Sequence, residues 1–144
     1  MKKRFSLLLF IVLLALPALP AVAMVDDAIS AAMEAAFPYV KQGYNVREDL
    51  WGGDLGVGQE KAITHTLFKG NDYWFFMASD TLAAKVSVHI YDGEGKLVEQ
   101  ETWHKGPSFG ARFKPTATGT YYLIVKVDKS PEERTHWALV YGYK

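Results

Sequence analysis

The stretch from Val86 to Val98, VSVHIYDGEGKLV, decides the fold of this chain of 144 residues. Apolar and polar residues alternate on both sides of a short glycine-containing turn, which is the pattern of a β-hairpin with one buried face. Residues Gly93–Gly95 fit a three-residue loop whose last glycine adopts the left-handed conformation. This turn predicts that Asp92 faces Lys96, and it therefore sets the register of both strands.

The predicted register divides this hairpin into two faces. On the core face, Val86, Val88 and Ile90 would lie opposite Thr102, Gln100 and Val98. On the outer face, Lys85, Ser87 and His89 would lie opposite Trp103, Glu101 and Glu99. One interpretation is a solvated sheet surface with cross-strand pairs, each worth about 0.2–1 kcal/mol. The other is a ligand platform, in which Trp103 stacks on a flat apolar ring face and Lys85, Glu99 and Glu101 bind hydroxyl groups beside His89.

Short runs of β-branched and aromatic residues, separated by Gly, Asp, Asn and Pro, continue on both sides of this hairpin. Strands are predicted near residues 44–51, 60–68, 72–79, 84–92, 96–104, 109–114, 119–128 and 134–143. The four consecutive aromatics Tyr73–Phe76 predict a strand that is covered on both faces. About eight closely spaced strands predict a mainly β fold, an antiparallel β-sandwich of the jelly-roll kind.

Residues 24–43 are predicted to form one short helix in front of a sandwich domain over residues 44–144. Its apolar residues recur every three or four positions, at Val25, Ile29, Met33, Ala36, Phe37 and Val40. Asp26 and Asp27 favour a helix start, and Gly43 favours a stop. Because so short a helix is marginal alone, we expect its apolar stripe to dock on the sheet. The alternative is a stripe that binds a partner.

Residues 1–23 have the plan of a secretory signal peptide. The cations Lys2–Arg4 precede the uncharged run Leu7–Leu16, and Ala21–Ala23 supply a small-x-small cleavage site. The run is shorter than the roughly 20 apolar residues that a membrane span needs. Loss of 23 residues and three cations would leave 121 residues with 13 basic and 16 acidic side chains, a net charge of −3. We therefore expect a periplasmic or secreted protein with no transmembrane segment after cleavage.

Composition and motifs narrow the possible functions. A formal net charge of zero argues against a nucleic-acid binder. The absence of cysteine excludes disulfides, thiolate zinc sites and cysteine nucleophiles. There is no G-x-S-x-G motif and the four histidines are scattered, so no catalytic residue, metal or cofactor is predicted. The glycine-rich stretch Trp51–Gly58 lacks a following Lys-Ser/Thr and is predicted to be a loop.

Three segments, Gly58–Tyr73, Val86–Val98 and Gly119–Val125, combine strand and turn patterns. They resemble the opening, the central hairpin and the closing strand of the pre-peptidase C-terminal domains of bacterial exported proteins. The resemblance covers roughly residues 58–128, and it is shared with other carbohydrate-binding-like sandwiches. It implies an accessory or binding module. No peptidase domain precedes it here, and Ala83–Lys85 replace the acidic pair usual before the central strand, so no calcium role is carried over.

Three functions remain open. The first is a non-catalytic exported module that binds a glycan, a peptide or an envelope protein, and it predicts an aromatic shelf or groove. The second is a structural or interaction subunit of an envelope assembly, and it predicts an exposed apolar helix face or an oligomer. The third and least favoured is an enzyme, which would gather histidines and carboxylates of perturbed pKa in one cleft.

Overall fold

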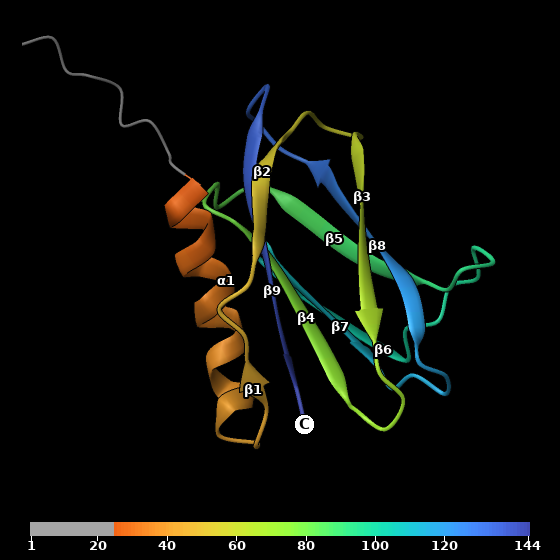
Figure 1. The fold of residues 1–144 in the computed structure, drawn as a ribbon. Helices are drawn as coiled ribbons and strands as arrows, with labels where there is room; N and C mark the ends of the chain where they lie inside the picture. The colour runs from red at the N-terminus through yellow and green to blue at the C-terminus, as the bar shows by residue number, and fades with distance from the viewer. Residues whose placement is uncertain (1–24) are drawn as a thin grey trace, which may run out of the picture.

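A computed structural model describes residues 25–144, so the predicted signal peptide lies outside the described residues. Within this range the chain forms one helix followed by nine strands (Figure 1). The elements are α1 (Val25–Val40), β1 (Asn45–Val46), β2 (Trp51–Leu55), β3 (Glu60–Leu67), β4 (Tyr73–Ser79), β5 (Lys85–Tyr91), β6 (Glu101–Lys105), β7 (Ser108–Phe113), β8 (Gly119–Lys129) and β9 (Thr135–Tyr143). No helix among these residues is long and apolar enough to cross a membrane.

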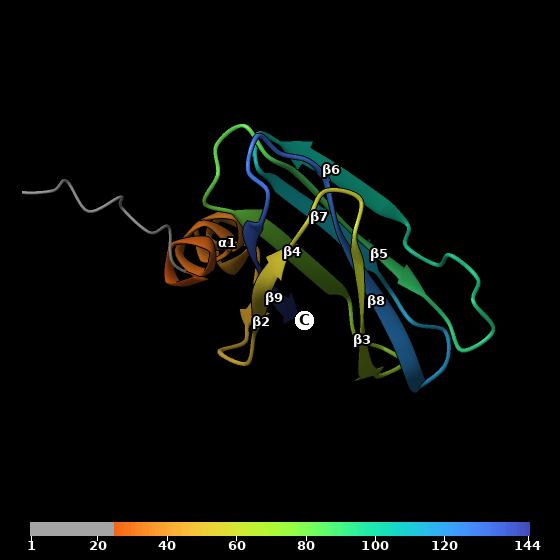
Figure 2. The same cartoon turned by 90° about the horizontal axis from the view of Figure 1, so that it is seen from above.

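The strands form two antiparallel sheets that face one another. The larger sheet has the order β1-β9-β4-β7-β6, and β2 pairs with a second part of β9. The smaller sheet has the order β3-β8-β5. Figure 2 shows α1 lying on the outer side of the larger sheet, so the molecule has three layers. The predicted fold class, a mainly β antiparallel sandwich with one N-terminal helix, is confirmed.

Strand β4 is buried along its whole length, as the run of four aromatics predicted. Tyr73, Phe75 and Met77 point between the sheets, where they join the core of the sandwich. Trp74 and Phe76 point the other way, into a second core beneath α1. The alternation of side chains along one strand therefore supplies both cores.

Helix α1 docks on the sheet mainly through alanines, so the predicted docking stripe is right at Ala36 and wrong at its large residues Met33, Phe37 and Val40. Ala28, Ala32 and Ala36 are at most 1% exposed beneath the helix. Met33, Phe37 and Val40 are 39%, 61% and 50% exposed. The physical reason is volume. Trp74 and Phe76 of β4 already fill the layer under the helix, and the distance between packed elements depends on the side chains at the contact.

The predicted hairpin is correct at its turn and wrong beyond it. Gly95 has a φ of +80°, and the Asp92 N–H donates to the Lys96 carbonyl at 2.9 Å. The Val98 N–H still donates to the Ile90 carbonyl at 2.9 Å. After this pair the chain crosses to the other sheet, where it runs as β6 beside β7.

This crossing overturns the predicted pairs of Val86 with Thr102, Val88 with Gln100, Ser87 with Glu101 and Lys85 with Trp103. Trp103 instead lies opposite Gly110. Strand β5 pairs instead with β8, which offers a longer run of paired apolar residues. A six-stranded sheet over a three-stranded one is the result, and β6 becomes the rim of the larger sheet.

Two further boundaries differ from the prediction. The glycine-rich stretch expected as a loop contains β2, and the expected strand 44–51 is reduced to the two residues of β1. In β2 the backbone of Gly52 and Gly53 pairs with β9, while Trp51 and Leu55 pack against the core. Because only two of its five residues carry an apolar side chain, β2 lacks the alternation from which a strand is recognised.

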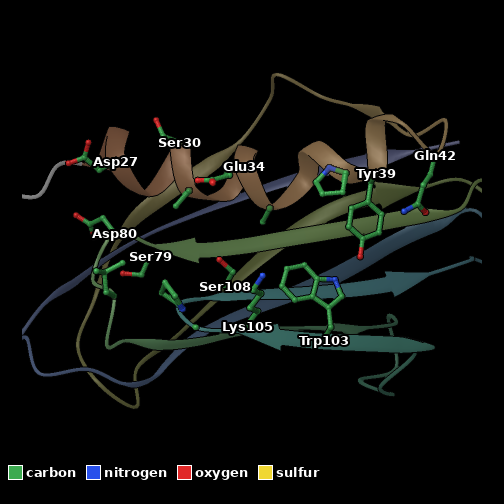
Figure 3. A pocket seen from close by; sticks show the side chains of 16 residues that line it. Asp27, Ser30, Glu34, Tyr39, Gln42, Ser79, Asp80, Trp103, Lys105 and Ser108 are labelled. Atoms are coloured by element: carbon green, nitrogen blue, oxygen red, sulfur yellow. The ribbon is translucent and has the colours of Figure 1, made fainter.

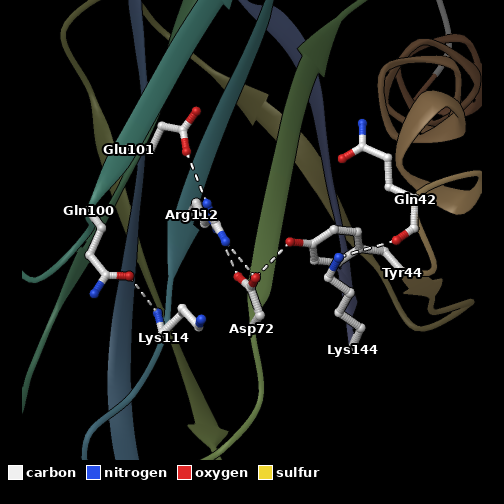
Figure 4. A network of polar contacts seen from close by, with 8 residues as sticks. All are labelled: Gln42, Tyr44, Asp72, Gln100, Glu101, Arg112, Lys114 and Lys144. Atoms are coloured by element: carbon white, nitrogen blue, oxygen red, sulfur yellow. Dashed lines mark hydrogen bonds and ion pairs between the residues drawn. The ribbon is translucent and has the colours of Figure 1, made fainter.

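An ion pair with a buried carboxylate ties Tyr44 and the last residue, Lys144, to the larger sheet (Figure 4). The carboxylate of Asp72 accepts hydrogen bonds from Arg112 at 2.7 and 2.9 Å and from the Tyr44 hydroxyl at 2.8 Å. The backbone groups of Asp72 and Lys144 pair with each other at 2.9 and 3.2 Å. Burial disfavours the charged form of Asp72, but the hydrogen bonds from Arg112 and Tyr44 outweigh burial and lower its pKa.

This lowered pKa predicts an acid-dependent loss of stability. A carboxyl whose pKa is depressed by folding contributes stability above its unfolded pKa of about 3.9, and loses it as pH falls through the folded pKa. Asp72→Asn should lower the free energy of unfolding at pH 7 by about 1.5–3 kcal/mol, the scale of hydrogen bonds to a charged group. It should also flatten the dependence on pH below about 4. Denaturant titrations from pH 2 to pH 7 measure both effects.

Asp128→Asn is the matched control, because Asp128 is an exposed carboxylate on β8. It should leave both the stability at pH 7 and the acid slope nearly unchanged. Equal effects of the two substitutions would contradict the role assigned to Asp72.

Candidate functional site

A groove runs along α1, between the helix and the hairpin formed by β6 and β7 (Figure 3). It forms because α1 packs on β9 and β4 and barely reaches β7. Its volume is about 1100 Å³. The helix contributes Asp27, Ser30, Ala31, Glu34, Ala35, Pro38, Tyr39 and Gln42, and the opposite wall is formed by Ser79, Asp80, Leu82, Trp103, Lys105, Gly106, Pro107 and Ser108. We call it the α1–β6 groove.

The indole of Trp103 forms the aromatic wall of this groove. It lies flat on the backbone of Gly110, where a Cβ atom would come within 2.3 Å of its Nε1 atom. It also packs against Phe76, with 6.5 Å between ring centroids. The φ of Gly110 is not positive, so the glycine is required for space and not for backbone conformation. Trp103 therefore stays half-buried, as one wall of the groove.

Two residues of the groove keep buried polar atoms that have no hydrogen-bond partner among residues 25–144. They are Nε1 of Trp103 and both carboxylate oxygens of Asp80. Figure 3 shows Asp80 at the end where α1 begins and Trp103 toward the end where α1 stops, beside Tyr39. A buried polar group without a partner costs about 1–3 kcal/mol, so three such atoms around one groove are uncommon. A cost of this kind is more typical of a binding site than of a surface shaped for stability alone.

The groove is also predominantly acidic. Asp27, Glu34 and Asp80 contribute three carboxylates, whereas Lys105 contributes one ammonium group. None of these four side chains forms an ion pair with another described residue. Their charges are therefore available to a ligand in the groove.

The structure divides the five predicted ligand-binding residues into two groups. Trp103 lines the groove, Glu101 follows on the same face of β6, and Lys85 lies near its hairpin, with Nζ 3.5 Å from the Gly106 carbonyl oxygen. Glu101 is bound to Arg112, at 3.3 Å. His89 and Glu99 lie apart from them and bind each other. The single platform expected from the hairpin register does not form.

His89 and Glu99 close the point where the chain crosses between the sheets. Nδ1 of His89 lies 2.5 Å from one oxygen of Glu99, and the Ile90 N–H donates to the other at 2.9 Å. The Glu99 side chain is only 6% exposed. The hydrogen bond to Glu99 raises the pKa of His89, and it outweighs burial, which opposes the charged form. We assign this pair a structural role.

The raised pKa of His89 predicts a second pH dependence, with the opposite sign. A histidine whose pKa rises on folding contributes stability that is complete below its unfolded pKa of about 6.5, and that disappears as pH rises through the folded pKa. His89→Gln should therefore destabilise the protein most at about pH 6, and progressively less toward pH 9. Thermal melts across this range test it. His104→Gln, at an exposed histidine of β6, should show no such trend.

A smaller hollow of about 360 Å³ opens between β3 and β9. It is lined by Arg47, His65, Thr66, Phe68, Asn71, Tyr73, Tyr141 and Tyr143. Its buried groups are satisfied internally. Tyr141 donates to Asp49 at 2.9 Å, and burial together with this bond raises the pKa of Tyr141 to about 12. Burial lowers the pKa of His65. This hollow is therefore the weaker candidate for a binding site.

No protein-family model matches this chain, and no curated protein matches it. The resemblance to pre-peptidase C-terminal domains therefore remains a prediction. Among residues 25–144, no three histidine or carboxylate side chains gather closely enough to hold a metal ion.

Trp103 was predicted from the sequence as a ligand-binding residue, whereas the other residues that line the groove were not. Asp27, Glu34 and Tyr39 belong to a helix that precedes Trp103 by more than sixty positions, and Asp80 belongs to the loop after β4. The one available signal was the polar helix face at Asp27, Ser30, Glu34 and Gln42. That polar face indicates a groove only when it is known that the alanine face of the helix packs on the sheet.

The contact of Trp103 with Gly110 can be tested by a double-mutant cycle. Gly110→Ala should cost about 1–3 kcal/mol of unfolding free energy, because the new methyl group collides with the indole. In the Trp103→Ala background the same change should cost less than about 0.5 kcal/mol, the limit for independent sites. Urea denaturation of the four proteins measures the coupling. Gly119→Ala is the control, since no atom lies within 4 Å of the added methyl group.

Proposed function

We propose that this protein is an exported, non-catalytic binding module, and that its ligand occupies the α1–β6 groove. The proposed ligand is a glycan, a peptide or a segment of an envelope protein. The observation that carries the proposal is one large groove with an aromatic wall and unpartnered polar atoms in two of its lining residues. The N-terminal sequence supports export.

Three properties of the groove support this function. Its volume of about 1100 Å³ lies slightly above the range of about 300–1000 Å³ that is typical of ligand pockets, as expected for an open groove. Tryptophan and tyrosine, which face one another here, are the side chains that most often anchor a ligand or partner. The groove also combines apolar walls with a few polar groups, and such groups fix the orientation of a ligand.

Ligand capture with groove variants tests the proposal. The processed protein would be screened against a glycan array, a peptide library and an envelope extract. Trp103→Ala and Gly110→Ala should each weaken capture of the bound ligand at least about tenfold, as for a central anchor residue. Tyr122→Ala is the matched control, because this tyrosine is 37% exposed on the smaller sheet. A ligand whose affinity is unchanged by both groove variants would contradict the proposal.

A second function is favoured by a different surface. Met33, Phe37 and Val40 form an exposed apolar stripe along α1, on the side opposite to the groove residues of the helix. Contiguous exposed apolar residues are typical of an interaction surface. This stripe supports the alternative of an interaction subunit in an envelope assembly.

The two functions can be separated by changes on the stripe. If the stripe is an assembly surface, Phe37→Ser should lower the size of the native complex in sedimentation of cell-envelope extracts. Leu97→Ser removes a comparably exposed residue from the tip of the central hairpin and should leave the size unchanged. An unchanged sedimentation profile for Phe37→Ser would exclude the stripe as the assembly surface.

A further inference from the structure

The α1–β6 groove has the dimensions of one extended polypeptide strand. It follows α1 from Asp27 to Gln42, a distance of about 22 Å at about 1.5 Å per residue. Its volume spread over this length gives a mean cross-section of about 50 Å². A strand packed among its neighbours occupies about 4.8 Å by 10 Å, which is nearly the same area. At about 3.3 Å per residue, the groove holds six or seven extended residues.

The charge of the groove favours a basic ligand. Asp27 and Asp80 lie at the same end of the groove, and Glu34 lies about two helical turns further along α1 than Asp27 (Figure 3). Both oxygens of Asp80 are buried without a donor among the described residues. These oxygens therefore keep their full capacity to accept hydrogen bonds from a ligand. A lysine or arginine side chain would supply both a positive charge and several donors.

The other end of the groove favours an apolar side chain. Trp103, Tyr39 and Pro38 line this end and present mainly ring surfaces. The Nε1–H of Trp103 is a donor without an acceptor among the described residues, and a backbone carbonyl of a bound segment would supply one. A neutral glycan could stack on Trp103 but offers no cation to Asp80, so this arrangement fits a peptide better.

We infer that the ligand of the α1–β6 groove is an extended peptide segment of six or seven residues, with a lysine or arginine beside Asp80 and an apolar side chain beside Trp103. This inference rests on the binding function proposed above and names its ligand class. It also accounts for the unpartnered atoms of Asp80 and Trp103 together.

A random heptapeptide library displayed on phage is the direct test. Selection on the processed wild-type protein should enrich lysine and arginine at least fivefold over the unselected library and should deplete aspartate and glutamate. Asp80→Asn should reduce the enrichment of basic residues at least threefold. Trp103→Ala should abolish the enrichment of apolar residues at the opposite end of the peptides. Asp128→Asn, an exposed carboxylate on the other sheet, should change neither.

Stability measurements keep folding defects from imitating these results. Because the Asp80 oxygens have no partner, Asp80→Asn should leave the urea midpoint unchanged or raise it. A loss of basic preference together with an unchanged or raised midpoint supports the inference. A lowered midpoint would show that Asp80 has a structural partner, and it would overturn the inference.

The remaining outcomes separate this inference from the proposed function. If the captured peptides show no preference for basic residues, and if Trp103→Ala abolishes their capture, the inferred ligand class is wrong but the groove is still the binding site. If glycans are captured in a way that depends on Trp103, and no peptide is enriched, the inferred ligand class is again wrong and the groove is still the binding site. Capture of every ligand independently of Trp103 overturns both the ligand class and the proposed function.

Discussion

The burial of β4 on both faces is the constraint on which the rest of the structure depends. One face of Tyr73–Ser79 must be covered by the smaller sheet, and the other must be covered by something else. The second cover is α1, which lies over β4 and β9 because Trp74, Phe76 and Val140 are there. The helix is narrower than the sheet, so β7 and β6 extend beyond it. The groove is the consequence of this difference in width.

The same constraint explains the unusual orientation of α1. Large aromatic side chains rise from the sheet, so the helix approaches with alanines and leaves Met33, Phe37 and Val40 in solvent. Hydrophobic periodicity locates such a helix correctly but points to the wrong docking face. The periodicity reports where apolar residues lie around the helix, whereas docking depends on the volume that the sheet leaves free. No pattern within residues 25–40 contains that second quantity.

Local signals predicted the features that local energetics determine. The turn at Gly93–Gly95 and the first pairs of its hairpin formed as expected, because the loop itself sets that register. The crossing after Val98 was not predictable in this way. It depends on whether β8 or residues 101–105 pair better with β5, and these competing partners lie far apart in the sequence. Trp103 could therefore be predicted as a ligand-binding residue, but the residues that surround it in the groove could not be predicted.

The position of β9 has a consequence for how this chain folds. The last strand pairs with β1, β2 and β4, so the larger sheet joins residues near position 46 to residues near position 142. Contacts of such long sequence separation slow folding, because the loop must close before the pairing is rewarded. Neither the larger sheet nor the layer under α1 can be completed until the final residues have been synthesised.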